Sequence, residues 1–290
     1  MNGISIIIPT YNEEKAILDT IRELHETMKA SGIPYQIIIV NDCSKDGTRE
    51  ILESNGGGDG LGVTLVHHDL NRGYGASIKT GSKYAQYDVL CITDSDGTYP
   101  NARIPDLYAD MKGHDMVVGA RIGKNVHIPW LRRAPKAFIN GLASYVSEVK
   151  IPDLNSGLRV FTKELFDRFY RLYPNGFSLT STITLAALTN GYAVKYAKID
   201  YFKREGSSKI RPIKDTMNFV MLILRMCVLF NPLRIFIPLS LILLFLGTGI
   251  LVWGLTAVGK FYDGTFIMLS LSAIQFFCMG LIADAISRKE

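Results

Sequence analysis

The sequence has few cysteines and no compositional bias of the kind that marks a non-globular chain. Four cysteines occur among 290 residues, and no two of them form a CxxC pair, so a disulfide scaffold is not expected. Glycine shows no three-residue period, and apolar residues make up 48% of the chain, which excludes a collagen-like or disordered protein. We expect reduced thiols that face a cytosol.

Two phosphate-binding motifs and a secretory signal are also absent. No GxGxxG turn follows the first apolar run, and GxxxxGK[ST] occurs nowhere. The glycine-rich loops that bind phosphate in dinucleotide-binding and P-loop proteins are therefore absent, which argues against both kinds of site. The N-terminus lacks the basic region and apolar stretch of a signal peptide, and we therefore expect the first part of the chain to stay in the cytoplasm.

Charge is nearly missing from the C-terminal part of the chain. Between residues 235 and 283 the only charged side chains are Lys260 and Asp263. Residues 235–258 and 265–283 are each long enough to cross a bilayer, which predicts a transmembrane hairpin with a short tail after it. Lysine and arginine lie before the first span and after the second, so both termini should be cytoplasmic. Two buried core helices are the alternative.

The net charge of +5 comes from one segment. Residues 201–234 hold seven basic and two acidic side chains, and the remainder of the chain is neutral. This distribution argues against a nucleic-acid-binding protein and predicts a basic loop and an interfacial helix, over residues 213–230, at the surface of a lipid bilayer. Binding of anionic lipids alone would explain the same charges. The chain thus divides into residues 1–200, 201–234 and 235–290.

The first 200 residues alternate short apolar runs with amphipathic segments. We expect strands at 4–9, 36–41, 63–67, 88–93 and 116–120, and helices at 13–30, 47–53, 75–86, 105–112 and 134–149. Continuous β-branched runs separated by helices predict an α/β fold, a Rossmann-like, mostly parallel sheet with helices on both faces. Ligands bind beyond the carboxyl ends of such strands, so the chemistry should lie in the residues that follow each run.

Polar side chains follow the first two expected strands. Tyr11 and Glu13 follow the first one, and an aromatic ring with a carboxylate can stack on and hydrogen-bond a nucleobase or ribose. Asp42 ends the second strand, where it can accept a hydrogen bond from the same groups. Asp46 is expected only to cap the next helix.

Asp94 and Asp96 follow the fourth expected strand. Two carboxylates at positions i and i+2 of an extended segment project to the same side, and the small residues beside them let a ligand approach. Together with diphosphate oxygens and waters they make the oxygen shell that Mg²⁺ or Mn²⁺ prefers. The sequence therefore predicts a divalent-metal site that binds a diphosphate.

Several motifs, in order along the chain, resemble the family 2 glycosyltransferases, which have the GT-A fold. The motifs span roughly residues 4–211 and read IIIPTYNE (6–13), VNDCSKDGT (40–48), NRGYG (71–75), TDSD (93–96), VGAR (118–121) and DLNSGLR (153–159). Within the family they are similar to those of dolichyl-phosphate mannose synthase and bacterial polyprenyl-phosphate glycosyltransferases. The bacterial members also carry a two-helix membrane hairpin. The resemblance implies that residues 1–200 are a GT-A catalytic domain.

The resemblance also implies roles for individual residues. The metal would be held by Asp94 and by Asp96, its principal ligand. Residues expected to contact the nucleotide sugar are Pro9, Tyr11, Glu13, Asp42, Asp94, Asp96, Arg204 and Lys209. Residues expected to bind an acceptor phosphate are Arg121 with Arg132 or Arg133. The catalytic set would then be Asp96, Arg121 and Asp153.

Two positions depart from the family pattern. Mannose synthases commonly carry glutamine two residues after the second aspartate, whereas this chain has Thr98, which leaves the metal's third protein ligand open. Members that glycosylate a hydroxyl carry a carboxylate base late in the domain, and residues 177–184 contain none. A phosphate monoester, with a second pKa near ~6, needs no such base. Asp153 is a candidate acid/base or metal-proximal group, or a turn cap.

These observations predict a membrane-bound inverting glycosyltransferase. It would move a sugar from a UDP- or GDP-linked donor to a polyprenyl phosphate at the cytoplasmic face, and its relatives predict a homo-oligomer. One alternative is a transferase acting on a glycan hydroxyl, which predicts a carboxylate base near residues 177–190. The other is a catalytically silent, membrane-anchored scaffold that binds a nucleotide sugar, which predicts loss of the paired aspartates. Residues 177–190 contain no carboxylate, and both aspartates, Asp94 and Asp96, are present.

Overall fold

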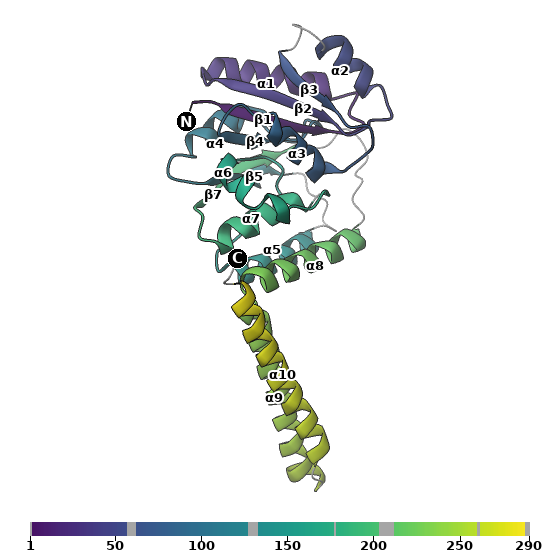
Figure 1. Ribbon diagram of the computed structural model, residues 1–290, viewed down its shortest axis with the longest axis vertical. Coiled ribbons are helices and arrows are strands. Elements are labelled where there is room, and N and C mark those ends of the chain that lie inside the picture. The colour runs from purple at the N-terminus through teal and green to yellow at the C-terminus, as the bar shows by residue number, and fades with distance from the viewer. Residues whose placement is uncertain are drawn as a thin grey trace. The chain divides into compact units, whose positions relative to one another are not determined.

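The computed structural model of the chain describes residues 2–56, 62–126, 133–176, 178–202, 212–259 and 262–287. They belong to two compact units, residues 1–219 and 220–290, and each unit is described by itself. The strands of the first unit are β1 (Ile4–Thr10), β2 (Tyr35–Asn41), β3 (Val63–His67), β4 (Val89–Ile92), β5 (Met116–Val126), β6 (Arg159–Thr162) and β7 (Val194–Tyr201) (Figure 1).

One sheet contains all of these strands, in the order β3-β2-β1-β4-β6-β5-β7. Neighbouring strands are parallel except at β6, which runs antiparallel to both β4 and β5. The expected α/β fold with a mostly parallel sheet is confirmed. Because β6 runs the other way, the loop that enters it lies at the same edge as the carboxyl ends of β4 and β5.

Helices cover both faces of this sheet. The described helices of the first unit are α1 (Ile17–Ser31), α2 (Thr48–Gly56), α3 (Tyr74–Lys83), η1 (Asn101–Arg103), α4 (Ile104–Ala109), α5 (Arg133–Ser147), α6 (Lys163–Arg168), η3 (Tyr170–Leu172) and α7 (Leu179–Thr189). On one face, apolar side chains of α1 and α4 pack with Ile6, Ile8 and Ile39 in a continuous buried core. On the other face Gly81 of α3 lies against Ile7 and Val40, at a distance that a side chain would not permit.

Several elements of this unit lie outside the sequence-based expectation, namely the strands β6 and β7, the helices α6 and α7, and the short helical turns η1 and η3. The strand expected to end at residue 120 continues to Val126, because β5 pairs with β7 as far as Arg121 and again at Val126. The helix expected over 105–112 is shorter, since α4 ends at Ala109 and a turn follows.

The second unit contains two long apolar helices. Helix α8 (Pro212–Phe230) crosses the boundary between the units, and α9 (Leu233–Trp253), a π-helical turn η4 (Gly254–Val258) and α10 (Asp263–Ser287) follow. Residues 233–258 and 263–287 are long and apolar enough to span a membrane, and only 6% and 11% of their apolar windows are buried. Such exposure is not that of two core helices of a soluble protein, so the predicted hairpin is supported.

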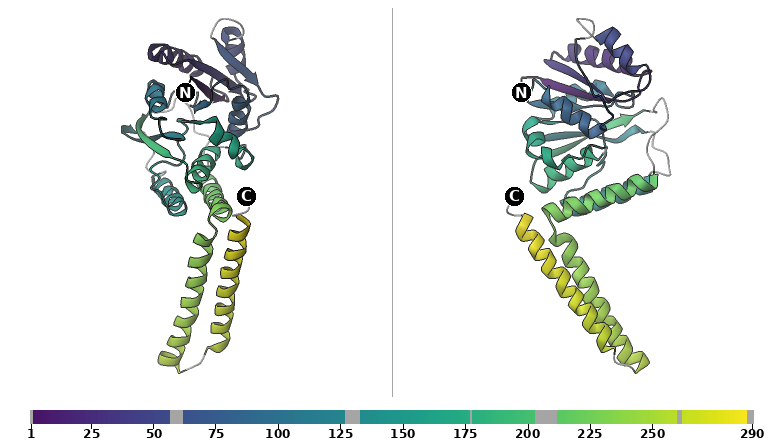
Figure 2. Two further views of the ribbon diagram at one scale, coloured as in Figure 1. Left: turned by 60° about the vertical axis from the view of Figure 1, so that its left-hand side comes forward. Right: turned by 45° about the vertical axis from the view of Figure 1, so that its right-hand side comes forward.

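The two apolar helices lie side by side as a hairpin (Figure 2). Gly280 permits the closest approach, since a Cβ atom there would lie 2.6 Å from the Cβ of Phe236. Gly247 meets Leu269 in a similar way, at 3.1 Å. Small residues at such positions let transmembrane helices approach closely, so van der Waals contact rather than hydrophobic burial holds the hairpin together.

Candidate active site

Asp94 and Asp96 occupy the loop that leaves the carboxyl end of β4, as the sequence predicts. Asp96 is 7% exposed, and its Oδ1 accepts hydrogen bonds from the hydroxyl of Thr98 at 2.6 Å and from the Thr98 backbone N–H at 3.2 Å. The hydroxyl of Tyr74, the first residue of α3, donates to Oδ1 of Asp94 at 3.0 Å. Both carboxylates are therefore held in defined orientations by neighbouring side chains.

Gly157, in the loop that enters β6, lets the backbone lie close against the Asp94 carboxylate. A Cβ atom at this position would lie 3.0 and 3.1 Å from the two carboxylate oxygens of Asp94. The backbone N–H of Gly157 donates to the hydroxyl of Tyr99 at 2.6 Å, which fixes the loop in this close approach. Any larger residue would press on the carboxylate.

These residues fit a divalent metal that takes most of its ligands from a substrate. Among the described residues no three His, Cys, Asp or Glu side chains converge on one point, so the protein would supply the carboxylates of Asp94 and Asp96. An all-oxygen set that leaves several positions for phosphate oxygens and water is typical of Mg²⁺ and Mn²⁺. Mannose synthases commonly have a glutamine at the position of Thr98. In this chain the Thr98 hydroxyl donates to Asp96 and so orients that carboxylate.

Arg121 and Asp153 form a buried ion pair at the same edge of the sheet. Asp153 is fully buried, and Arg121 donates to it through Nε at 2.7 Å, through Nη2 at 2.9 Å and through its backbone N–H at 2.9 Å. The Nζ atom of Lys136, on α5, lies 3.1 Å from Oδ1 of Asp153. The guanidinium also lies over the ring of Tyr201, 5.1 Å from its centre. This places Arg121 in one orientation.

The electrostatics of Asp153 favour a positioning role over the acid/base role considered from the sequence. Burial alone would raise the pKa of this carboxyl, but Arg121 and Lys136 outweigh burial and hold the pKa well below its usual range. Conversely, burial would lower the pKa of Arg121, yet its neighbours, Asp153 among them, keep that pKa well above the ordinary value. The pair is thus permanently charged and has no proton to exchange near neutral pH.

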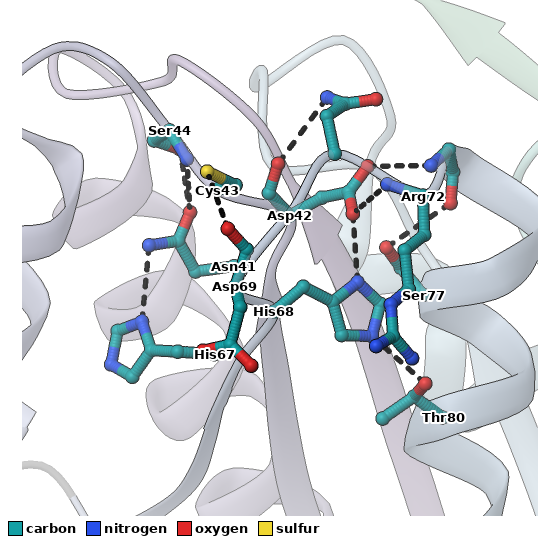
Figure 3. Close-up of polar contacts among 12 residues, drawn as sticks. Asn41, Asp42, Cys43, Ser44, His67, His68, Asp69, Arg72, Ser77 and Thr80 are labelled. Atoms are coloured by element: carbon teal, nitrogen blue, oxygen red, sulfur yellow. Dashed lines mark hydrogen bonds and ion pairs between the residues drawn. The ribbon is translucent and has the colours of Figure 1, made fainter.

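Asp42 lies at the end of β2, as predicted, but its carboxylate is directed at the neighbouring loop (Figure 3). It accepts the backbone N–H of Arg72 and that of Gly73, each at 2.8 Å, and Nδ1 of His68 lies 2.7 Å from Oδ1. Its side chain is 5% exposed. These contacts use most of the acceptor capacity of a carboxylate, which favours anchoring of the loop over direct contact with a nucleoside.

The loops after β1 and β2 are joined by hydrogen bonds. The backbone N–H of Glu13 donates to Oγ1 of Thr48, and Asn12 exchanges hydrogen bonds with Ser44 and Lys45. Pro9 is buried in β1, whereas Tyr11 and Glu13 are partly exposed. Asp46 accepts the N–H and hydroxyl of Thr48, the first residue of α2, as expected for a cap. The structure therefore brings the Tyr11–Glu13 segment and the start of α2 together at the carboxyl edge of the sheet.

Three of the basic residues named from the sequence, Arg132, Arg204 and Lys209, lie outside the described residues. Arg133 begins α5, and its side chain is likewise outside the described set. Their assignment to the acceptor or donor phosphates stays a prediction.

Several side chains of the site were not assigned a role from the sequence. Tyr74, Lys136 and Arg159 are the main ones. Arg159, in β6, is fully buried, and its guanidinium donates to the carbonyl of Thr180, the hydroxyl of Thr184 and the carbonyl of Ser156. Its position in the sequence could have indicated a role, because Arg159 is a charged residue inside the short apolar run after Gly157. Tyr74 and Lys136 gave no comparable signal, because their partners come from other elements.

Comparison with known proteins places the chain in a family. The profile of glycosyl transferase family 2 matches residues 5–170, and that of the GtrB C-terminal hairpin matches residues 231–288. The chain is 28% identical over 299 residues to the undecaprenyl-phosphate 4-deoxy-4-formamido-L-arabinose transferase of Pseudomonas fluorescens (strain SBW25), an alignment that covers 98% of this chain and 84% of that protein. It is 27% identical over 215 residues to the dolichyl-phosphate hexose transferase of Haloferax volcanii, covering 73% and 88%.

Solved structures with the same fold include glucosyl-3-phosphoglycerate synthase from Mycobacterium tuberculosis in complex with Mn²⁺, UDP and glucosyl-3-phosphoglycerate. The TM-score is 0.60 at 15% identity, with 78% of this chain and 80% of that chain covered. This likeness concerns the fold alone. The family match over more than half of the chain, the GT-A architecture and the apolar hairpin together identify the protein as an integral membrane glycosyltransferase of family 2.

Proposed function

We propose that the protein transfers a sugar from a nucleoside diphosphate donor to a polyprenyl phosphate. The observation that carries this proposal is the arrangement of two carboxylates, Asp94 and Asp96, and an oriented cation, Arg121, at one edge of the sheet. The loop 153–157 contacts both groups, because Asp153 binds Arg121 and Gly157 lies against Asp94. Relatives named for undecaprenyl-phosphate and dolichyl-phosphate substrates support the choice of acceptor.

The donor end of the site is assigned to Asp94 and Asp96. Their carboxylates would hold Mg²⁺ or Mn²⁺, a cation that when bound supplies Lewis-acid stabilisation of a leaving diphosphate. Tyr74 and Thr98 hold the two carboxylates in place. The remaining donor contacts are assigned to the segment with Pro9, Tyr11 and Glu13 and to Arg204 and Lys209, while Asp42 supports the site by anchoring the adjacent loop.

The acceptor end is assigned to Arg121. A guanidinium can bind two phosphate oxygens at once, and the ion pair with Asp153 fixes its plane before the substrate arrives. Arg132 or Arg133 would add a second cation. A phosphate monoester is already anionic at pH 7, with a second pKa of about 6, so orientation suffices and no general base is required. A single displacement at the anomeric carbon would invert its configuration.

The lipid acceptor fits a protein anchored by a transmembrane hairpin. The polyprenyl chain would stay in the bilayer, and the phosphate would lie at the surface where the basic segment 201–234 is expected. The excess of lysine and arginine outside the two spans supports a cytoplasmic location for the catalytic unit and both termini.

The hairpin also supports a homo-oligomer. Gln275 lies at the centre of α10 and is exposed, although an amide in hydrocarbon is costly without a hydrogen-bond partner. Leu271, Cys278 and Ile282 are exposed on the same face of the helix, opposite Ala273 and Gly280, which are buried. A glutamine amide both donates and accepts, so the same side chain of a second copy is a suitable partner.

The test is a donor panel with defined acceptors. Purified full-length protein is incubated with undecaprenyl phosphate, a panel of UDP- and GDP-sugars and Mn²⁺ or Mg²⁺, and lipid products are identified by mass. We expect one donor to give a polyprenyl phosphate sugar with inverted anomeric configuration. Replacing undecaprenyl phosphate with undecaprenol should abolish the product. Equal transfer to the hydroxyl of undecaprenol, or no transfer from any donor, would overturn the proposal.

A further inference from the structure

His68 connects three elements beside the site and has no part in the function proposed above. It is the residue after β3 and is buried. Its Nδ1 lies 2.7 Å from Asp42 Oδ1, at the end of β2, and its Nε2 lies 2.9 Å from the hydroxyl of Thr80 on α3. Because a carboxylate oxygen only accepts, Nδ1 is the donor of the first bond. In the neutral ring Nε2 then accepts from Thr80, so one tautomer satisfies both contacts (Figure 3).

The loop between β3 and α3 depends on Asp42 for its position. Asp69, Leu70, Asn71 and Arg72 are exposed, so burial contributes little to holding them. Their described hydrogen bonds lead to the end of β2: Arg72 and Gly73 donate to the Asp42 carboxylate, Asn71 donates to the Asp42 carbonyl, and the Asp69 carbonyl accepts from Cys43. The orientation of the Asp42 carboxylate, which His68 fixes, therefore determines where this loop lies.

The loop in turn determines where Tyr74 enters the site. Gly73 has φ +95°, a backbone conformation that residues with a side chain rarely adopt. A Cβ atom at this position would also lie 2.6 Å from the carbonyl oxygen of Asn175. The chain thus has little freedom between the two anchored N–H groups and α3. Tyr74 follows directly and donates to Asp94 at 3.0 Å. A continuous set of hydrogen bonds and one peptide link runs from His68 through Asp42 to the first carboxylate of the DxD motif.

We propose that His68 is a positioning residue, which acts through Asp42 and Tyr74 to set the orientation of Asp94. Its contribution lies in the Nδ1 contact with Asp42, and the contact with Thr80 serves to hold the ring. The effect on sugar transfer rests on the function proposed above, whereas the effect on the loop does not.

Two substitutions separate the contacts of His68. The amide nitrogen of asparagine occupies the place of Nδ1, and that of glutamine occupies the place of Nε2, since each lies the same number of bonds from Cβ. His68→Asn should therefore keep the donor to Asp42, and His68→Gln should keep only the contact with Thr80. His67→Asn is the matched control, because His67 is the adjacent residue, in β3, and contacts Asn41 rather than Asp42.

The first measurement is amide hydrogen exchange of the segment 69–75 in the full-length protein. We expect His68→Gln to speed exchange of the Arg72 and Gly73 amides about tenfold, because local opening becomes easier. His68→Asn and His67→Asn should stay near the wild-type rate. Equal exchange in the asparagine and glutamine variants, whether fast or slow, would overturn the role of the Nδ1 contact.

The second measurement is a double-mutant cycle with Tyr74→Phe in the sugar-transfer assay. His68→Gln should lower kcat/KM by about 10- to 100-fold, the usual cost of a small misplacement of a catalytic group. The double variant should be no worse than the lower single variant, because both changes break the same route. Additive losses would contradict the route through Tyr74. If wild-type protein transfers no sugar, the proposed function fails, and the exchange measurement still decides whether His68 positions the loop.

Discussion

Arg121 and Asp153 meet through two parallel hydrogen bonds, from Nε to Oδ2 at 2.7 Å and from Nη2 to Oδ1 at 2.9 Å. The backbone N–H of Arg121 donates to the same carboxylate. The pair joins β5 to the loop that precedes β6, 32 residues later in the chain. A bidentate pair of this kind fixes the plane of the guanidinium as well as its position.

Asp153→Asn should weaken both the fold and the reaction. Arg121 and Lys136 would lose their shared negative partner in a buried place, and breaking such a pair costs about 3–5 kcal/mol of unfolding free energy. The released guanidinium would no longer be held for a phosphate, so we expect kcat to fall by about 10- to 100-fold. Chemical denaturation and steady-state kinetics measure the two effects.

The control for this substitution is Asp110→Asn. Asp110 pairs with Lys195 at 2.8 Å, but both side chains are more than a third exposed. An exposed pair contributes only about 0–1 kcal/mol. If the two variants were equally stable, the buried pair would not have the structural importance inferred here.

The stability difference between the wild type and Asp153→Asn should depend on pH only in acid. The folded-state pKa of Asp153 lies below its unfolded value of about 3.9. Such a carboxyl stabilises the fold at pH values above the unfolded pKa, and the contribution is lost as the pH falls through the folded pKa. We therefore expect a constant difference from about pH 5 to pH 8 that shrinks below about pH 4. A difference that changed near neutral pH would show that another group titrates with the pair.

Thr98→Val tests whether Thr98 prepares Asp96 for a metal ion. The change keeps the shape of the side chain and removes the hydroxyl that donates to Asp96 at 2.6 Å. Loss of one hydrogen bond to a charged group, about 1.5–3 kcal/mol, should raise the half-saturating Mn²⁺ concentration about tenfold or more. Direct Mn²⁺ binding, followed by electron paramagnetic resonance, should change in parallel.

Thr20→Val is the corresponding control. Thr20 is also buried and its hydroxyl contacts the same loop, but it donates to the Ser95 carbonyl and not to a carboxylate. Mn²⁺ affinity should stay close to wild type in this variant. A similar loss in both variants would indicate a general effect of the loop on binding.

The exposed face of α10 can be tested with a cysteine that the chain already contains. Cys278 lies three residues after Gln275 and is exposed. With Cys43, Cys91 and Cys227 replaced, mild oxidation of native membranes should give a disulfide-linked dimer through Cys278. Gln275→Leu should reduce the dimer, because the amide hydrogen bonds between copies are lost. Moving the cysteine to position 277, with Phe277→Cys and Cys278→Ala, should also reduce the amount of disulfide-linked dimer. Equal cross-linking from both positions would mean random collision.

The sequence predicted the sheet and the paired aspartates because both produce local patterns. Strands β1 to β5 are apolar runs between helices, and Asp94 and Asp96 follow one of them. Strand β6 has four residues, one of them Arg159, so no periodic pattern marks it. Strand β7 contains Lys195 and Lys198, and these charges interrupt the apolar pattern by which a strand is recognised in a sequence. The partners of the Asp42 carboxylate were not predictable, because Arg72 and Gly73 reach it from a loop about 30 residues away in the chain. The contact between Thr98 and Asp96, by contrast, is local, since the two residues are only two positions apart.

The position of β6 between β4 and β5 limits how the protein can tolerate changes in chain length. Val160 pairs with Cys91 on one side and Val117 on the other, and the neighbouring Arg159 and Phe161 are buried as well. A one-residue shift in register would move every side chain of β6 to the opposite face of the sheet. An insertion in residues 153–158 could therefore not be absorbed by sliding the strand. Extra residues would have to fit within a loop whose Asp153 and Gly157 contact Arg121 and Asp94. We therefore expect this loop to vary between relatives by substitution rather than in length.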